Sequence, residues 1–136
     1  MMRRSGGIVT LLAGCLWLSL LIGCSRPTPE ELASLAAKGY YDHLIHGEYE
    51  LFLEGVDLRE NMDRDDFRSQ LLDCYRQFMA QQQTAHRGIL DVRVSNAKTD
   101  TIQKYTNVFL VLCYGDSTNE EIVVPMVERQ GRWRMK

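Results

Sequence analysis

The sequence has no excess of charge of either sign, because 16 lysines and arginines stand against 18 acids in 136 residues. This balance argues against nucleic acid as the main partner, since nucleic-acid-binding domains carry a strongly basic surface. Internal repeats and low-complexity segments are also absent from the sequence. With 45% hydrophobic residues the chain is too apolar for a disordered protein, and its length suits one small domain.

A run of about 20 apolar residues, which a permanent membrane-spanning helix needs, is missing as well. Residues 8–22 form a shorter apolar run that follows Arg3 and Arg4. A positively charged start followed by an apolar stretch of this length is the form of a secretory signal. The sequence therefore predicts export from the cytoplasm.

The end of the apolar run resembles a bacterial lipobox, with apolar Leu21 and Ile22, small Gly23 and then Cys24. In signals of this kind the cysteine thiol carries a diacyl group, the new N-terminus takes a further fatty acid such as palmitate, and the chain is cut just before the cysteine. The alternative is a plain signal or a lone anchor helix with an incidental cysteine. More than one acyl chain is enough for stable anchoring.

We therefore divide the chain into a lipoprotein signal peptide (1–23), a lipid-anchored tether (24–28) and one folded domain (29–136). Ser25 follows the cysteine where an aspartate would otherwise retain the protein in the inner membrane. This predicts a bacterial outer-membrane location, on the periplasmic face. The predicted partners are the membrane, through the anchor, and either a second copy of the chain or another envelope protein.

Three helices are predicted at the start of the folded domain. Thr28 and Glu31 are spaced as in a capping box, so the first helix should run from residue 29 to 46. A short helix follows at 48–53, and a longer one begins at Asp63. The longer helix carries an apolar stripe made of Phe67, Leu71, Cys74 and Phe78. We expect this stripe to pack on a sheet at Val92, Leu110, Val124 and Trp133.

After Gly88, apolar residues recur at every second position. This alternation predicts strands at 90–95, 101–114, 121–128 and 132–136. Helices followed by antiparallel strands indicate an α+β fold. By alternation the side chains that face the helices are Leu90, Val92, Val94, Val108, Leu110, Leu112, Ile122, Val124, Met126, Trp133 and Met135. Pro125 cannot donate to a ladder, so we expect a bulge there.

The order of elements, the pattern of Gly47, Glu48, Tyr49 and Phe52, and the ending Gly131-Arg132-Trp133-Arg134-Met135 resemble the nuclear transport factor 2-like superfamily. Within it, the chain is similar to small lipid-anchored envelope proteins of uncharacterised function. The resemblance implies a curved sheet around the helices, with a cavity at the open end of the cone. The superfamily contains isomerases, dehydratases and binding modules, so the fold does not decide the function.

The predicted inward positions include no acid or histidine, and this favours a non-enzymatic protein. It would bind a small molecule in the cone, with Tyr40, His43 and Trp133 as candidate ligand-binding residues, or a partner protein on the sheet. The alternative is a small isomerase- or hydratase-like enzyme that uses a cavity near Tyr40 and His43. His43 and His46 have no local third ligand, so neither a metal nor a cofactor is predicted.

The opposite face of the sheet carries a predicted apolar patch of Phe109, Val111, Val123 and Val127. We expect self-association or partner docking there; alternatively, Tyr105 and long arginines cover the patch within a monomer. Cys74 and Cys113 either form a disulfide or remain two buried thiols, and the second is favoured. Residues 129–136 hold four bases, which form either a solvated face or a contact with lipid phosphates.

Overall fold

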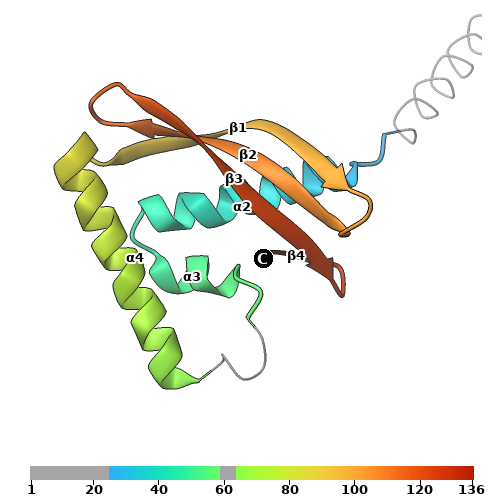
Figure 1. Cartoon of the computed structure of the whole chain (residues 1–136), viewed down its shortest axis with the longest axis horizontal. Coiled ribbons are helices and arrows are strands. Elements are labelled where there is room, and N and C mark those ends of the chain that lie inside the picture. Colours follow the sequence, from blue (N-terminus) through green and yellow to red (C-terminus); the bar gives the residue numbers. More distant parts are fainter. Residues whose placement is uncertain (1–24, 59–63) are drawn as a thin grey trace, which may run out of the picture.

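Residues 25–58 and 64–136 are described by the computed structural model, in which helices precede an antiparallel sheet. The helices are α2 (Pro29–Ile45), α3 (Tyr49–Glu54) and α4 (Asp65–His86). The strands are β1 (Ile89–Asp100), β2 (Tyr105–Tyr114), β3 (Asn119–Arg129) and β4 (Arg132–Met135), in the order β1-β2-β3-β4 (Figure 1). The predicted α+β class is confirmed. The predicted signal peptide and Cys24 lie outside the described residues.

Helix α2 begins where the capping box predicted. The Thr28 hydroxyl accepts a hydrogen bond from the Glu31 amide at 3.2 Å, and the Glu31 carboxylate accepts one from the Thr28 amide at 3.4 Å. Ala33, Ala37 and Leu44 form the buried side of α2 and join the core of the sheet. Two alanines on this side let the helix lie close against the strands, across the curved sheet (Figure 1). In the described part of the chain, no helix has the length and apolar character to cross a membrane.

Helix α4 does not cover the sheet, so the predicted packing of its stripe on Val92, Leu110, Val124 and Trp133 is wrong. None of its residues is buried; Cys74 and Phe78 are exposed, and Phe78 retains 37% of its surface. Figure 1 shows α4 standing at the side of the molecule, beyond α3. The reason is that α2 already occupies the face of the sheet that the stripe was expected to cover.

The stripe of α4 packs in part on α3 instead. The Phe52 ring of α3 lies edge-on to Tyr75 of α4 at 4.9 Å and to Tyr41 of α2 at 5.3 Å. Phe52 is buried and belongs to the same core cluster as Ala33 and Val92. The short helix α3 therefore joins the middle of α4, at Tyr75, to the core.

The inward alternation is confirmed along β2, where Val108, Leu110 and Leu112 are buried. In β1 the buried Val92 also agrees with the prediction, but Leu90 keeps 70% of its surface, so the prediction is wrong there. Val94 pairs with the buried Leu110 and lies on the same face as Val92, but it is exposed. Register shifts lie between Ile89 and Asp91 and between Val94 and Asn96. Leu90 is the extra residue at the first shift, so Ile89 takes its place on the inward face beside Val92.

Pro125 forms no bulge, and that prediction is also wrong. The pairing of β2 with β3 is continuous from Thr106 opposite Met126 to Cys113 opposite Asn119. The Pro125 carbonyl accepts from the Lys136 amide at 2.8 Å, so its nitrogen points toward β4, which ends at this level. The missing N–H therefore removes no bond from the ladder between β2 and β3.

The chain after α3 runs beside β4. The Met135 amide donates to the Gly55 carbonyl and the Asp57 amide donates to the Met135 carbonyl, both at 2.6 Å. This parallel pairing between Val56 and Met135 connects residues about 80 positions apart. It brings the end of α3 against the arginine-rich strand β4.

Candidate functional site

Tyr40 and Trp133, two of the predicted ligand-binding residues, are in contact. The Tyr40 hydroxyl donates to the Trp133 carbonyl at 2.7 Å, and its ring fills the space beside Gly55. His43 is engaged elsewhere, with its Nδ1 at 3.1 Å from a Glu48 carboxylate oxygen. The structure thus brings together Tyr40 and the Trp133 backbone, while His43 is hydrogen-bonded separately to Glu48. A ligand-binding role for the three stays a prediction.

The predicted apolar patch on the opposite face of the sheet is partly covered. Phe109 and Val111 are half-buried and Val127 is buried, whereas Val123, which pairs with Phe109, keeps 51% of its surface. The two cysteines of the described residues form no disulfide. Cys74 is exposed, contrary to the expected burial, and the Cys113 sulfur accepts from the Arg93 guanidinium at 3.2 Å.

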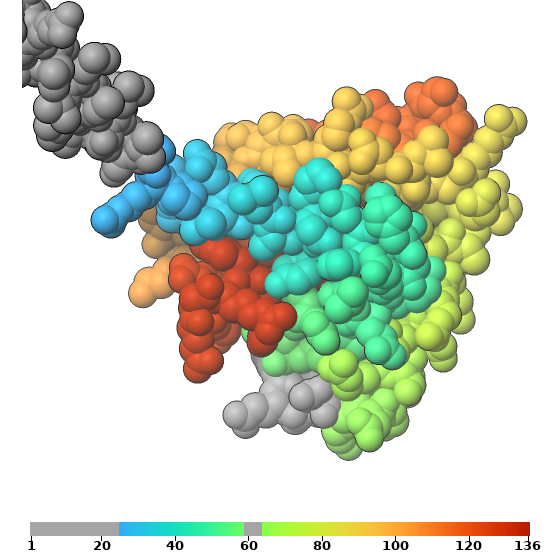
Figure 2. All heavy atoms as spheres, turned by 180° about the vertical axis from the view of Figure 1, so that it is seen from behind, coloured from blue at the N-terminus to red at the C-terminus, as the bar shows by residue number. Residues whose placement is uncertain are grey.

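A cleft of about 520 Å³ lies between the end of α3 and strand β4. We call it the arginine cleft, and its described lining is Leu53, Glu54, Val56, Leu58, Arg68, Arg132 and Arg134. In the space-filling view, β4 (red) and the end of α3 (green) lie side by side on one face (Figure 2). The pairing of Gly55 and Asp57 with Met135 fixes the distance between these two walls.

The charge of the arginine cleft is positive over its described lining, with three arginines and one acid. The Nε of Arg134 is buried and has no hydrogen-bond partner among the described residues. Leaving a buried donor unsatisfied costs about 1–3 kcal/mol. A guanidinium presents a planar set of donors that suits carboxylate and phosphate groups. Because this Nε is buried, an anion in the cleft would pair with it only after the Arg134 side chain turns outward, and it would then satisfy a donor that the described part of the protein leaves without a partner.

Another arginine on this part of the fold is committed to a protein contact. Arg129, in the same hairpin, contacts the Asp57 carboxylate at 3.1 Å. Arg132, by contrast, is exposed and makes no ion pair within the described ranges. The concentration of bases in residues 129–136 was visible in the sequence. Their position beside α3 was not, because it depends on the long-range pairing of Gly55 with Met135.

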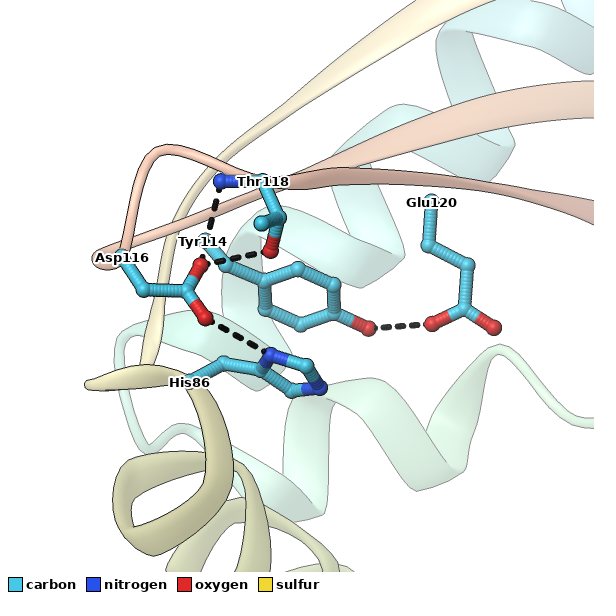
Figure 3. Close-up of polar contacts among 5 residues, drawn as sticks. All are labelled: His86, Tyr114, Asp116, Thr118 and Glu120. Carbon is cyan, nitrogen blue, oxygen red and sulfur yellow. Dashed lines mark hydrogen bonds and ion pairs between the residues drawn. The ribbon is translucent and has the colours of Figure 1, made fainter.

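A second polar cluster joins the end of α4 to the turn between β2 and β3 (Figure 3). Asp116 accepts from the amide of Thr118 at 3.0 Å and from its hydroxyl, and lies 2.9 Å from His86 Nδ1. These hydrogen bonds, that of the Thr118 hydroxyl first, lower the pKa of Asp116 to about 2. The carboxylate is therefore strongly held in its charged form.

The aromatic side chains of this cluster are also engaged in contacts within the protein. The His86 ring stacks on Tyr114 with 4.2 Å between centroids, and the Tyr114 hydroxyl donates to Glu120. Burial raises the pKa of Tyr114 to about 12, with the Glu120 carboxylate as the second cause. The backbone adds two bonds of 2.9 Å, from Gly115 to the Gly88 carbonyl and from Asp116 to the His86 carbonyl. This arrangement is best explained as a joint that holds α4 to the sheet.

Comparison with known proteins supports the fold. No protein-family model and no curated protein matches the sequence. A solved structure from Campylobacter jejuni, named "Putative NTF2-like transpeptidase", superposes with a TM-score of 0.58. The two sequences are 13% identical, and the match covers 73% of this chain and 92% of the other. At this identity the likeness concerns the fold alone: the chain has the NTF2-like fold, as the sequence resemblance predicted.

Proposed function

We propose that this protein is a lipid-anchored binding module that holds a small anionic ligand in the arginine cleft. The observation that carries the proposal is the buried Arg134 Nε, which lacks a partner among the described residues and lines a cleft of ligand size. The NTF2-like fold is compatible with small-molecule binding in a cone. A carboxylate or phosphate would pair with Arg132 and Arg134 and turn an unsatisfied donor into a charge-assisted hydrogen bond.

The other walls of the arginine cleft narrow the class of ligand. Leu53, Val56 and Leu58 contribute apolar side chains, and the acid Glu54 lies at the same cleft. A ligand that fits would have one anionic group for the arginines and an apolar body for the α3 side. A fully hydrated inorganic anion would use only part of these contacts.

The anchor is the second part of the proposal, and residues 21–24 support it. Acylation at Cys24 would hold the domain at the bacterial outer membrane, on the periplasmic face. The tether of residues 24–28 is short and contains Pro27, which disfavours helix before it. The cleft would then sample ligands close to the membrane surface.

The occupied polar groups favour binding over catalysis. The Tyr40 hydroxyl donates to a backbone carbonyl and His43 pairs with Glu48, so an enzyme that uses these two residues would first have to break both contacts. The solved neighbour is named a transpeptidase, and acyl transfer needs a nucleophile with a base in reach. No histidine or lysine is hydrogen-bonded to Cys74 or Cys113 in the described part of the chain. We therefore regard an enzymatic function as the second candidate, after ligand binding.

Native mass spectrometry of the protein extracted from its own envelope tests both parts of the proposal. The polypeptide mass should include the acyl groups and be shortened by residues 1–23, and Cys24→Ser should leave an unacylated protein in the soluble fraction. A small acidic molecule should accompany the wild-type chain and be lost from Arg134→Gln. Arg26→Gln removes the same charge from the tether and should retain the molecule. If the Arg134→Gln protein retains the bound molecule, or if the wild type carries none, the proposal that the arginine cleft binds the ligand would be contradicted.

A further inference from the structure

Ile102 is held on the surface by an ordered turn between β1 and β2. It keeps 89% of its surface, more than the other exposed large apolar residues of the described chain. The Asp100 carboxylate accepts from the amides of Ile102 and Gln103 at 2.9 and 3.0 Å. The Lys104 amide closes the turn on the Asp100 carbonyl at 2.9 Å. Contact with water does not stabilise an isoleucine side chain, so burial of Ile102 in an apolar environment would be favourable.

This turn lies at the end of the molecule from which the tether leaves. The Thr99 hydroxyl donates to the Glu30 carboxylate in the first turn of α2 at 2.7 Å. Pro29, Thr101 and Lys104 line one shallow cavity. Figures 1 and 2 both show the start of α2 beside the turn between β1 and β2, so the two segments are neighbours in space.

The length of the tether limits how far this end can move from the bilayer. Five peptide steps separate Cys24 from Pro29. At about 3.3–3.6 Å for each residue, the span is at most about 18 Å when fully extended. With Cys24 acylated, as the proposed function requires, the turn between β1 and β2 would be held within reach of the lipid headgroups.

We infer that the turn at residues 101–104 docks on the lipid bilayer that carries the anchor, with Ile102 inserted at the headgroup boundary. Lys98 and Lys104 are exposed near the same turn and would face lipid phosphates while their stems stay on the apolar side. Three acids lie near the turn: Asp100 accepts from its amides, Glu30 accepts from Thr99 of β1, and Glu128 lines the same cavity as Lys104. This contact fixes the orientation of the domain on the membrane.

Two tryptophan variants of the lipidated protein, reconstituted in vesicles, test this inference. Ile102→Trp places a reporter at the turn, and Leu90→Trp places one at the opposite end of β1, where the native residue is also exposed. Trp133 is the native tryptophan of the mature chain and gives both variants the same background. The vesicles contain phosphatidylethanolamine and phosphatidylglycerol, with or without bromine on the acyl chains, because bromine quenches only tryptophans at the bilayer.

Brominated vesicles should at least halve the added emission of Ile102→Trp and leave that of Leu90→Trp unchanged. Equal emission with and without bromine in both variants, on protein that floats with the vesicles, would overturn the docking while the anchor stands. Quenching of both variants would overturn the proposed orientation. Protein that does not float with vesicles would overturn the anchor, and this inference with it.

Discussion

Gly55 shows how one residue fixes the geometry of the arginine cleft. A Cβ on Gly55 would lie 2.5 Å from the Tyr40 ring, and that ring is held by its hydroxyl bond to Trp133. Gly55→Ala should therefore lower the free energy of unfolding by about 1–3 kcal/mol. Gly39→Ala is the matched control, because a Cβ there meets nothing within 4 Å inside α2. It should raise stability by up to about 1 kcal/mol in the same urea titration. Equal effects of both changes would contradict this packing.

Asp116 predicts a specific loss of stability in acid. Its pKa falls to about 2 in the folded chain from an ordinary value of 3.8, so the unfolded chain binds the proton first as pH falls. The stabilisation is complete above about pH 4 and is lost as pH approaches 2. In Asp116→Asn this part of the pH dependence of the free energy of unfolding should vanish. Plots of that free energy against pH for the variant and the wild type should therefore converge near pH 2. Curves that stay parallel from pH 5 to 2 would show that the carboxylate does not stabilise the fold.

At the scale of elements, α3 rather than α4 holds the helical side of the core. Phe52 is buried between Tyr41 and Tyr75, whereas Phe78 of α4 keeps 37% of its surface. Phe52→Ala should cost about 3–5 kcal/mol of unfolding free energy. Phe78→Ala removes the same atoms and should cost about 1 kcal/mol, because its site is open to solvent. Chemical denaturation of both variants checks this order, and a larger cost at Phe78 would mean that α4 covers the sheet after all.

Local signals predicted the elements that depend on neighbours in sequence. The capping box of Thr28 and Glu31 placed the start of α2, and the alternation in β2 gave its buried face. The bulges of β1 were invisible, because an extra residue in a strand becomes apparent only against its partner. The position of α4 was wrong for a related reason: an apolar stripe identifies a face to be buried but not the surface that buries it. The arginine cleft was missed because Gly55 and Met135 meet only in the folded chain.

At the scale of the whole molecule, the outer face of the sheet is the proposed site of self-association. Phe109 and Val111 are half-buried and Val123 is more exposed, so a second copy would cover a small apolar strip. Light scattering on the chain from residue 25 onward should give a dimer mass, and Phe109→Glu should restore the monomer by placing a charge in the strip. A monomer in both proteins, well above micromolar concentration, would show that the remaining strip is too small to hold two copies together.

The central claim is that Arg134 makes the cleft between α3 and β4 an anion site. Scanning calorimetry of the chain from residue 25 onward, with increasing benzoate and separately with phenyl phosphate, each an anion with an apolar body, measures this most directly. A ligand at 100 times its Kd stabilises the folded state by about 2.7 kcal/mol. We predict saturable stabilisation by at least one of the two anions, lost in Arg134→Gln and kept in Arg26→Gln, which removes an equal charge from the tether. The same stabilisation in all three proteins, or none in the wild type, would contradict the account.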